Sequence, residues 1–261
     1  MSLDERWIRS LHVEAMRHAD LDAEHEPHAL FQASTIGALL EGAFEGDVTF
    51  AELAERGDLG LGTVNHLDGE MLALDGRFYR ADVEGRLHEL AGTERTPFAV
   101  VVPFSPEIEF DLEGSVDHDR LLAEIDRRIP ADAATSAVRI DGRFELVRAR
   151  SVPRQEPPYR PLTEVVAEQK VFELGAVDGT MVGFRFPEYA EGIEVSGWHL
   201  HFISEDRSRG GHVLDSRLET GHVALDPSGE LSVELPPGVN LEDVEQASST
   251  HDAIDRIENQ G

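Results

Sequence analysis

A segment in the last third of the chain reads GWHLHFI over residues 197–203, and His212 follows soon after it. Side chains alternate between the two faces of a β-strand, so His199 and His201 project from the same face. The apolar side chains between and beside them fall on the opposite face, where they suit a packed core. The segment therefore predicts a strand with one apolar face and one face that carries two imidazoles.

The residues that follow predict the second strand of a hairpin. Residues 204–211 are polar and end in two glycines, which indicates a turn, and His212 opens the returning strand. One hairpin can therefore bring His199, His201 and His212 together. Three neutral imidazoles suit Zn²⁺, and a three-ligand site leaves one coordination position free for a substrate. A strand histidine is nevertheless more often a surface or core residue than a ligand, and we interpret His222 as a surface residue.

The composition limits the classes of protein to which the chain can belong. It has 261 residues and no cysteine, so a metal would have to be bound by histidine and carboxylate, and we expect a cytoplasmic location. The net charge of −29, from 23 basic and 52 acidic residues, argues against a nucleic-acid or anionic-membrane partner. We interpret this charge as a hydrated acidic surface adapted to high salt, which gives the hypothesis of a halophilic source.

Turn and helix signals divide the chain into short elements. Asp75-Gly76 and Asp141-Gly142 each stand between strand-like segments, so each predicts a hairpin. Thr49 is expected to cap a helix over residues 50–56, and residues 118–128 have helical spacing. The glycine-rich run at 57–63 lacks the features of a phosphate-binding loop.

Four prolines between Pro153 and Pro161 indicate a crossing between domains. We therefore expect an N-terminal α/β domain with a mixed sheet over residues 1–160. An antiparallel β domain that carries the metal site is expected over 161–261. Within the second domain, residues 171–174, 175–186, 193–203, 212–218 and 221–225 are interpreted as successive strands, and residues 241–258 are expected to form a C-terminal helix.

Several separated motifs together resemble the alpha-acetolactate decarboxylase family, a group of zinc enzymes, from about Phe31 to Glu258. The motifs are FQASTIGAL at 31–39, GDLGLGTVNHLDGE at 57–70, RSVPRQ at 150–155, GWHLHF at 197–202 and GGHVLD at 210–215. The combination of LDGE with the spaced histidines and the later Gly-His is specific, although no single motif is. The resemblance implies an α+β fold in which the mixed sheet of the N-terminal half packs beside the antiparallel sheet of the C-terminal half. It also implies a homodimer.

The resemblance also implies an activity and a set of site residues. The activity is metal-dependent decarboxylation of 2-acetolactate to acetoin and CO₂, a carbon–carbon lyase reaction. By the resemblance, His199, His201 and His212 are the zinc ligands. The implied catalytic residues are Glu70, Thr63, Arg150 and Glu258.

Each implied role has a chemical reason. Loss of CO₂ leaves an electron pair that becomes an enediolate, and a Lewis-acid zinc stabilises that charge. Arg150 can hold the substrate carboxylate with two hydrogen bonds, although strand alternation places Arg148 on the same face, so that the residues alone do not choose between the two. Glu70 or Glu258 is the candidate to protonate the enediolate on one face, because two carboxyl groups in one pocket raise each other's pKa.

Two other classes of protein compete with this interpretation. A cupin-like dioxygenase or isomerase would use His199, His201 and Glu205 as ligands, but Ser232 stands where its last histidine is needed. A non-catalytic binding protein could have kept the fold and lost the chemistry. That second alternative is disfavoured because every motif position carries a chemically suitable residue.

Overall fold

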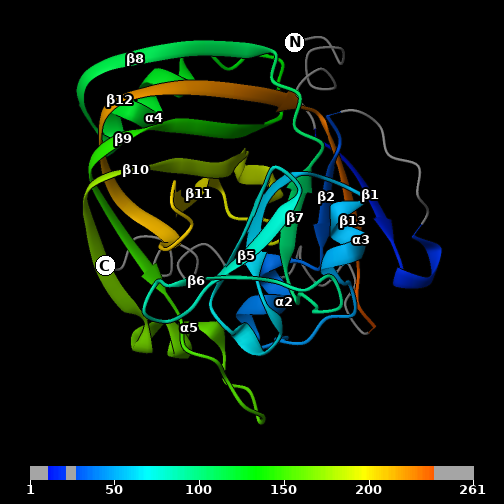
Figure 1. Cartoon of the computed structure of the whole chain (residues 1–261). Helices are drawn as coiled ribbons and strands as arrows, with labels where there is room; N and C mark the ends of the chain where they lie inside the picture. The colour runs from blue at the N-terminus through cyan, green and yellow to red at the C-terminus, as the bar shows by residue number, and fades with distance from the viewer. Residues whose placement is uncertain (1–10, 22–27, 238–261) are drawn as a thin grey trace.

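The computed structural model describes residues 11–21 and 28–237, which form mainly β-structure in two sheets (Figure 1). The eight-stranded sheet has the order β1 (His12–Met16), β13 (Glu230–Glu234), β2 (Leu30–Ala33), β7 (Ala99–Val102), β3 (Leu59–Thr63), β4 (Glu70–Leu74), β5 (Arg77–Ala81) and β6 (Leu87–Glu89). The five-stranded sheet has the order β11 (Gly197–Ser204), β10 (Lys170–Phe186), β9 (Thr135–Ser151), β12 (Gly210–Ser228) and β8 (Ile108–Asp117).

The two sheets differ in strand direction. In the eight-stranded sheet, β13 runs parallel to both β1 and β2, and the other neighbours are antiparallel. The five-stranded sheet is antiparallel throughout, and it curls so that β11 pairs with β12 as well as with β10. This curl places the histidine-bearing end of β11 beside the start of β12.

Short helices connect and cover the sheets. They are α2 (Ile36–Leu40), α3 (Phe50–Ala54), α4 (His118–Asp126) and α5 (Leu162–Val165), with 3₁₀ turns η1 (His18–Asp20), η2 (Asn65–Leu67), η3 (Val166–Glu168) and η4 (Glu188–Ala190). The side chain of Thr49 caps α3 in a capping box with Glu52, as the sequence predicts. In the described part of the chain, no helix is long and apolar enough to cross a membrane.

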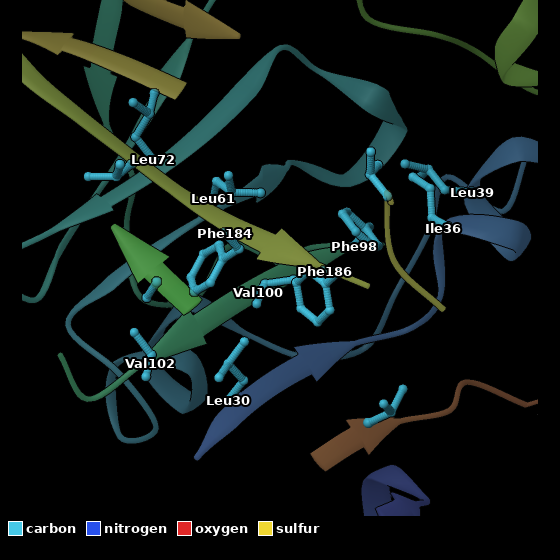
Figure 2. Close-up of a cluster of buried hydrophobic side chains, with 14 of the residues drawn as sticks. Leu30, Ile36, Leu39, Leu61, Leu72, Phe98, Val100, Val102, Phe184 and Phe186 are labelled. Carbon is cyan, nitrogen blue, oxygen red and sulfur yellow. The ribbon is translucent and has the colours of Figure 1, made fainter. Parts of the chain in front are cut away.

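Strand alternation builds three packed layers of apolar side chains. One cluster lies between the two sheets, where Leu61, Leu72 and Val100 of the eight-stranded sheet meet Phe184 and Phe186 of β10 (Figure 2). The opposite face of the eight-stranded sheet packs on α3 through Phe50 and Leu53. The opposite face of the five-stranded sheet packs on α4 through Leu121 and Ile125. Because each sheet is covered on both faces, side chains between the sheets are removed from solvent.

The two Asp-Gly signals have different outcomes. Asp75-Gly76 forms the predicted hairpin between β4 and β5, with Leu74 paired to Arg77 and positive φ at both turn residues. The hairpin predicted at Asp141-Gly142 is wrong, because β9 continues through it.

The physical reason is a row of glycines. Gly142 pairs with Gly179 of β10 and with Gly221 of β12, and a Cβ at Gly142 would lie 2.4 Å from the carbonyl oxygen of Thr220. Glycine here permits close backbone approach within long bent strands, not a reversal of the chain. The separate strands expected at 171–174 and 175–186 are likewise one strand, β10. Those expected at 212–218 and 221–225 are also one strand, β12.

The distribution of strands between the sheets does not follow the expected boundary at residue 160. Strands β8 and β9 precede that residue and lie in the five-stranded sheet, whereas β13 follows it and lies in the eight-stranded sheet. Because sheet membership alone does not define domains, the two-domain division stays a prediction. The expected C-terminal helix over residues 241–258 lies outside the described residues.

Candidate metal centre and active-site pocket

Three buried histidines from two adjacent strands come together at one point. His199, His201 and His212 have relative exposures of 7%, 0% and 2%. One ring nitrogen of each lies within 4.8 Å of the corresponding atoms of the other two. The ring centroids are 5.1 to 5.3 Å apart. The chain therefore folds these imidazoles into a group that could hold a metal ion, in the hairpin that the sequence predicts.

The local fold explains the convergence. His201 pairs with His212 across β11 and β12, and His212 pairs with Arg150 across β12 and β9. Residues that pair directly across antiparallel strands point to the same face, so the side chains of His201, His212 and Arg150 form one row. A Cβ at Gly211 would lie 2.6 Å from the carbonyl oxygen of Arg150. The glycine before His212 therefore lets β12 approach β9 closely.

Hydrogen bonds orient the rings of His199 and His201. The Nδ1 of His201 lies 2.8 Å from the backbone carbonyl oxygen of Met71, and a carbonyl only accepts, so this nitrogen donates. The Nδ1 of His199 lies 3.3 Å from Oε1 of Glu194. In both rings Nδ1 is engaged, which leaves Nε2 to face a metal in the neutral form.

Glu70 reaches the histidine group from the other sheet. Its Oε2 lies 3.6 Å from Nε2 of His201, and the residue has 8% relative exposure. Glu70 pairs with Thr63 across β4 and β3. The buried hydroxyl of Thr63 donates to the carbonyl oxygen of Gly69 at 2.6 Å. Thr63 therefore holds the backbone immediately before Glu70, and both side chains border the same pocket.

Arg150 also borders the pocket, from β9. It has 3% relative exposure, and its Nη1 donates to Oε1 of Gln169 at 3.0 Å. Arg148, the other arginine left open by strand alternation, is half-buried and does not line the pocket. The structure thus brings Arg150, and not Arg148, beside the histidines.

The pocket beside the histidines combines a polar floor with apolar walls. The polar side chains are those of Thr63, Glu70, Arg150, His199 and His212. The walls come from α2, η2, the segment formed by α5 and η3, and the residues next to the ends of β7 and β9. The apolar wall residues are Ile36, Leu39, Leu67, Phe98, Val152, Leu162 and Val166. A few converging polar groups within an apolar enclosure are typical of a site for a small molecule.

The other candidate residues are Glu258, Glu205 and His222. Glu258 lies outside the described residues. Glu205, which the cupin-like alternative needs as a ligand, is exposed in the turn after β11 and is not part of the histidine group. His222 is exposed as predicted and pairs with Asp111 at 2.8 Å, and this hydrogen bond raises the pKa of His222.

Sequence reasoning missed two residues that contact the site. Glu194 reaches the ring of His199, and Gln169 reaches the guanidinium of Arg150. Glu194 stands five positions before His199 and outside the strand, so strand periodicity does not relate them. Gln169 follows η3 and meets Arg150 only through the pairing of β9 and β10. Neither residue belongs to a recognisable spacing pattern.

Fold and site together define a two-sheet β protein whose enclosed pocket carries a potential metal centre, a carboxyl group and a guanidinium group. Comparison with known proteins identifies the group to which it belongs. The model of the alpha-acetolactate decarboxylase family matches residues 30–246. The chain belongs to the alpha-acetolactate decarboxylase family, and it is a carboxy-lyase.

Individual relatives agree with this assignment. The alpha-acetolactate decarboxylase of Methylococcus capsulatus is 40% identical over 261 residues, covering 99% of this chain and all of the relative. That of Methanosarcina mazei is 44% identical and covers 88% of this chain and 80% of the relative. The crystal structure of the Bacillus subtilis alpha-acetolactate decarboxylase superposes with a TM-score of 0.84 at 36% identity, covering 89% of this chain and all of that one. The cupin-like alternative is therefore wrong.

Proposed function

We propose that the chain decarboxylates 2-acetolactate to acetoin and CO₂ in this pocket, with zinc bound by His199, His201 and His212. The observation that carries the proposal is the buried three-histidine group within reach of Glu70 and beside Arg150. Three neutral nitrogen donors fit Zn²⁺, and they leave the ion's positive charge undiminished, unlike carboxylate ligands.

The protein side chains supply the binding and orientation. Arg150 would hold the substrate carboxylate through two parallel hydrogen bonds and set the breaking carbon–carbon bond perpendicular to the plane of the ketone. Bound zinc would supply Lewis-acid stabilisation of the negative charge that collects on the ketone oxygen. Thr63 keeps the Gly69 carbonyl in place and so fixes the start of β4, where Glu70 stands. The apolar walls exclude water from the enediolate.

The last step is proton delivery to one face of the enediolate. Glu70 is the described carboxyl group that lines the pocket, and its Oε2 lies 3.6 Å from His201 Nε2. We propose Glu70 as the acid on this ground. On the family resemblance alone, we also propose Glu258 as a second carboxyl group of the site, which would favour the protonated form of one of the pair.

Several wider proposals rest on composition and family. The chain is proposed to act in acetoin formation as a homodimer, and the net charge of −29 supports a halophilic source. The layout of a mixed-sheet domain beside an antiparallel domain that ends in a helix also stays a proposal. A cytoplasmic location remains an expectation from the sequence.

The decisive experiment follows acetoin formation from racemic 2-acetolactate at high salt, with and without a chelator. We expect acetoin, its loss with chelator, and recovery when zinc is returned. His212→Ala should lose both zinc and activity, whereas the matched variant His222→Ala, at an exposed histidine of the same strand, should keep both. A zinc-free His212→Ala variant with full activity would refute the metal centre. Absence of acetoin from folded, zinc-loaded protein would refute the substrate.

A further inference from the structure

Behind the metal centre lies a buried carboxylate that the proposed reaction does not use. Glu194 has 1% relative exposure and stands between η4 and β11. Its Oε1 lies 3.3 Å from Nδ1 of His199 and also accepts a hydrogen bond from the backbone N–H of Val195 at 3.0 Å. Burial of a carboxylate is unfavourable unless hydrogen bonds and charges compensate for the lost water. A buried carboxylate is therefore stable only where nearby groups form hydrogen bonds with it.

The segment that carries Glu194 is fixed to the far side of the pocket. The carbonyl oxygen of Ile193 accepts hydrogen bonds from the N–H of Ile36 at 2.9 Å and from Nε2 of Gln32 at 2.7 Å. The N–H of Glu194 donates to the carbonyl oxygen of Ala190 at 3.1 Å. Gln32 lies in β2 and Ile36 begins α2, so the eight-stranded side of the molecule holds this segment in place. These hydrogen bonds thus hold the segment that presents the carboxylate to His199.

We infer that Glu194 is a positioning residue for the metal centre, an inference that rests on the proposed metal function. By accepting a hydrogen bond from Nδ1 of His199, its carboxylate selects the tautomer whose Nε2 lone pair faces the metal. The same contact fixes the rotation of the ring and makes Nε2 a stronger electron-pair donor to the metal. Glu194 is not part of the three-histidine group and does not line the pocket.

The rings of His199 and His201 are oriented by groups of different kinds, and this makes the contact with Glu194 informative. His201 is oriented by the neutral backbone carbonyl of Met71, which no side-chain substitution removes. His199 is oriented by a side chain, and it is the most exposed of the three at 7%. The orientation of His199 therefore depends on a group that mutation can change without altering any ligand.

Two variants separate the charge of Glu194 from its hydrogen bond. Glu194→Gln keeps an oxygen that can accept from both His199 and Val195 but removes the negative charge. Glu194→Ala removes both. Glu188→Gln is the matched control, because Glu188 is an exposed glutamate of the adjacent η4 turn.

The measurements are zinc affinity, by competition with a chromophoric chelator, and the visible absorption of the Co²⁺-loaded protein. We expect Glu194→Ala to weaken zinc binding by about 10- to 100-fold and to alter the Co²⁺ spectrum. Glu194→Gln should fall between Glu194→Ala and wild type, and Glu188→Gln should match wild type. The unfolding temperature of the metal-free proteins separates loss of positioning from loss of folding.

The outcomes distinguish this inference from the function on which it rests. If wild-type protein binds zinc and both Glu194 variants bind it equally tightly with an unchanged Co²⁺ spectrum, the role of Glu194 is refuted and the metal centre stands. If wild-type protein does not bind zinc, the metal centre itself is refuted. If metal-free Glu194→Ala fails to fold, Glu194→Leu replaces it, because leucine fills the buried space without accepting the hydrogen bond of His199. An unaltered zinc affinity and Co²⁺ spectrum in that variant would refute the role of Glu194.

Discussion

Replacement of Arg150 by lysine keeps the positive charge but removes the planar fork of donors. Arg150 has 3% relative exposure in the pocket, and one of its donors already serves Gln169 at 3.0 Å. A single ammonium cannot hold the substrate carboxylate at two points and also satisfy Gln169. Loss of one hydrogen bond to a charged group costs about 1.5–3 kcal/mol. Since about 1.4 kcal/mol corresponds to a factor of ten in rate, Arg150→Lys should lower kcat/KM by about 10- to 150-fold.

The assay is initial-rate acetoin formation over a range of 2-acetolactate concentrations, with zinc content measured on the same samples. Arg148→Lys is the matched control, because Arg148 lies two residues away on β9, is half-buried and does not line the pocket. It should retain wild-type kinetics. Near-normal kcat/KM for Arg150→Lys together with a large loss for Arg148→Lys would refute the assignment and place the carboxylate-binding role on Arg148.

Three further predictions concern the proposed acid Glu70, the buried carboxyl group of Glu234 and the negative charge of the protein. Glu70→Gln should keep zinc but lower kcat by about 10²- to 10⁴-fold, because the amide cannot deliver a proton, and wild-type turnover would remove Glu70 from the chemistry. Burial raises the pKa of Glu234, so the folded state binds this proton more tightly than the unfolded state and stability falls as pH rises through the folded pKa. Glu234→Gln should therefore raise the unfolding temperature at pH 8 and not at pH 4, and an equal change at both would contradict the argument. With a net charge of −29, the wild-type unfolding temperature should rise between 0.1 M and 2 M KCl, and a fall would contradict the halophilic hypothesis.

Local sequence patterns could predict the elements that depend on local geometry. The two-residue spacing of His199 and His201 and the turn before His212 predict the hairpin that the structure contains. The same reasoning fails at Asp141-Gly142, where the dipeptide is compatible with both a reversal and a bend. Gly179 and Gly221 favour the bend, because with Gly142 they allow β9, β10 and β12 to approach one another closely at this point. Their pairing with Gly142 is a long-range property that no short window of sequence contains.

The supporting contacts of the site could not be predicted for a related reason. Strand alternation treats Arg148 and Arg150 alike, but the pairing between β12 and β9 shifts register between Val213 and Asp215. The irregularity lies in β12, because β9 pairs with β10 in regular register through both arginines. Arg150 is the residue that pairs with His212, and a count of alternate residues along β9 does not include that pairing. The contacts of Glu194 and Gln169 likewise depend on tertiary packing and leave no periodic signal.

The site is built from residues of both sheets, so a substitution that shifts one sheet against the other changes the geometry of the site. His201 belongs to the five-stranded sheet, yet its ring donates to the carbonyl oxygen of Met71 in the eight-stranded sheet, next to Glu70. Phe184, the strand partner of His199, lies in the apolar cluster between the sheets (Figure 2). Packing in that cluster therefore sets the distance between the carboxyl group and the histidines. A cavity made at Phe184 should reduce turnover more than zinc content, because the three ligands share one hairpin and the acid does not.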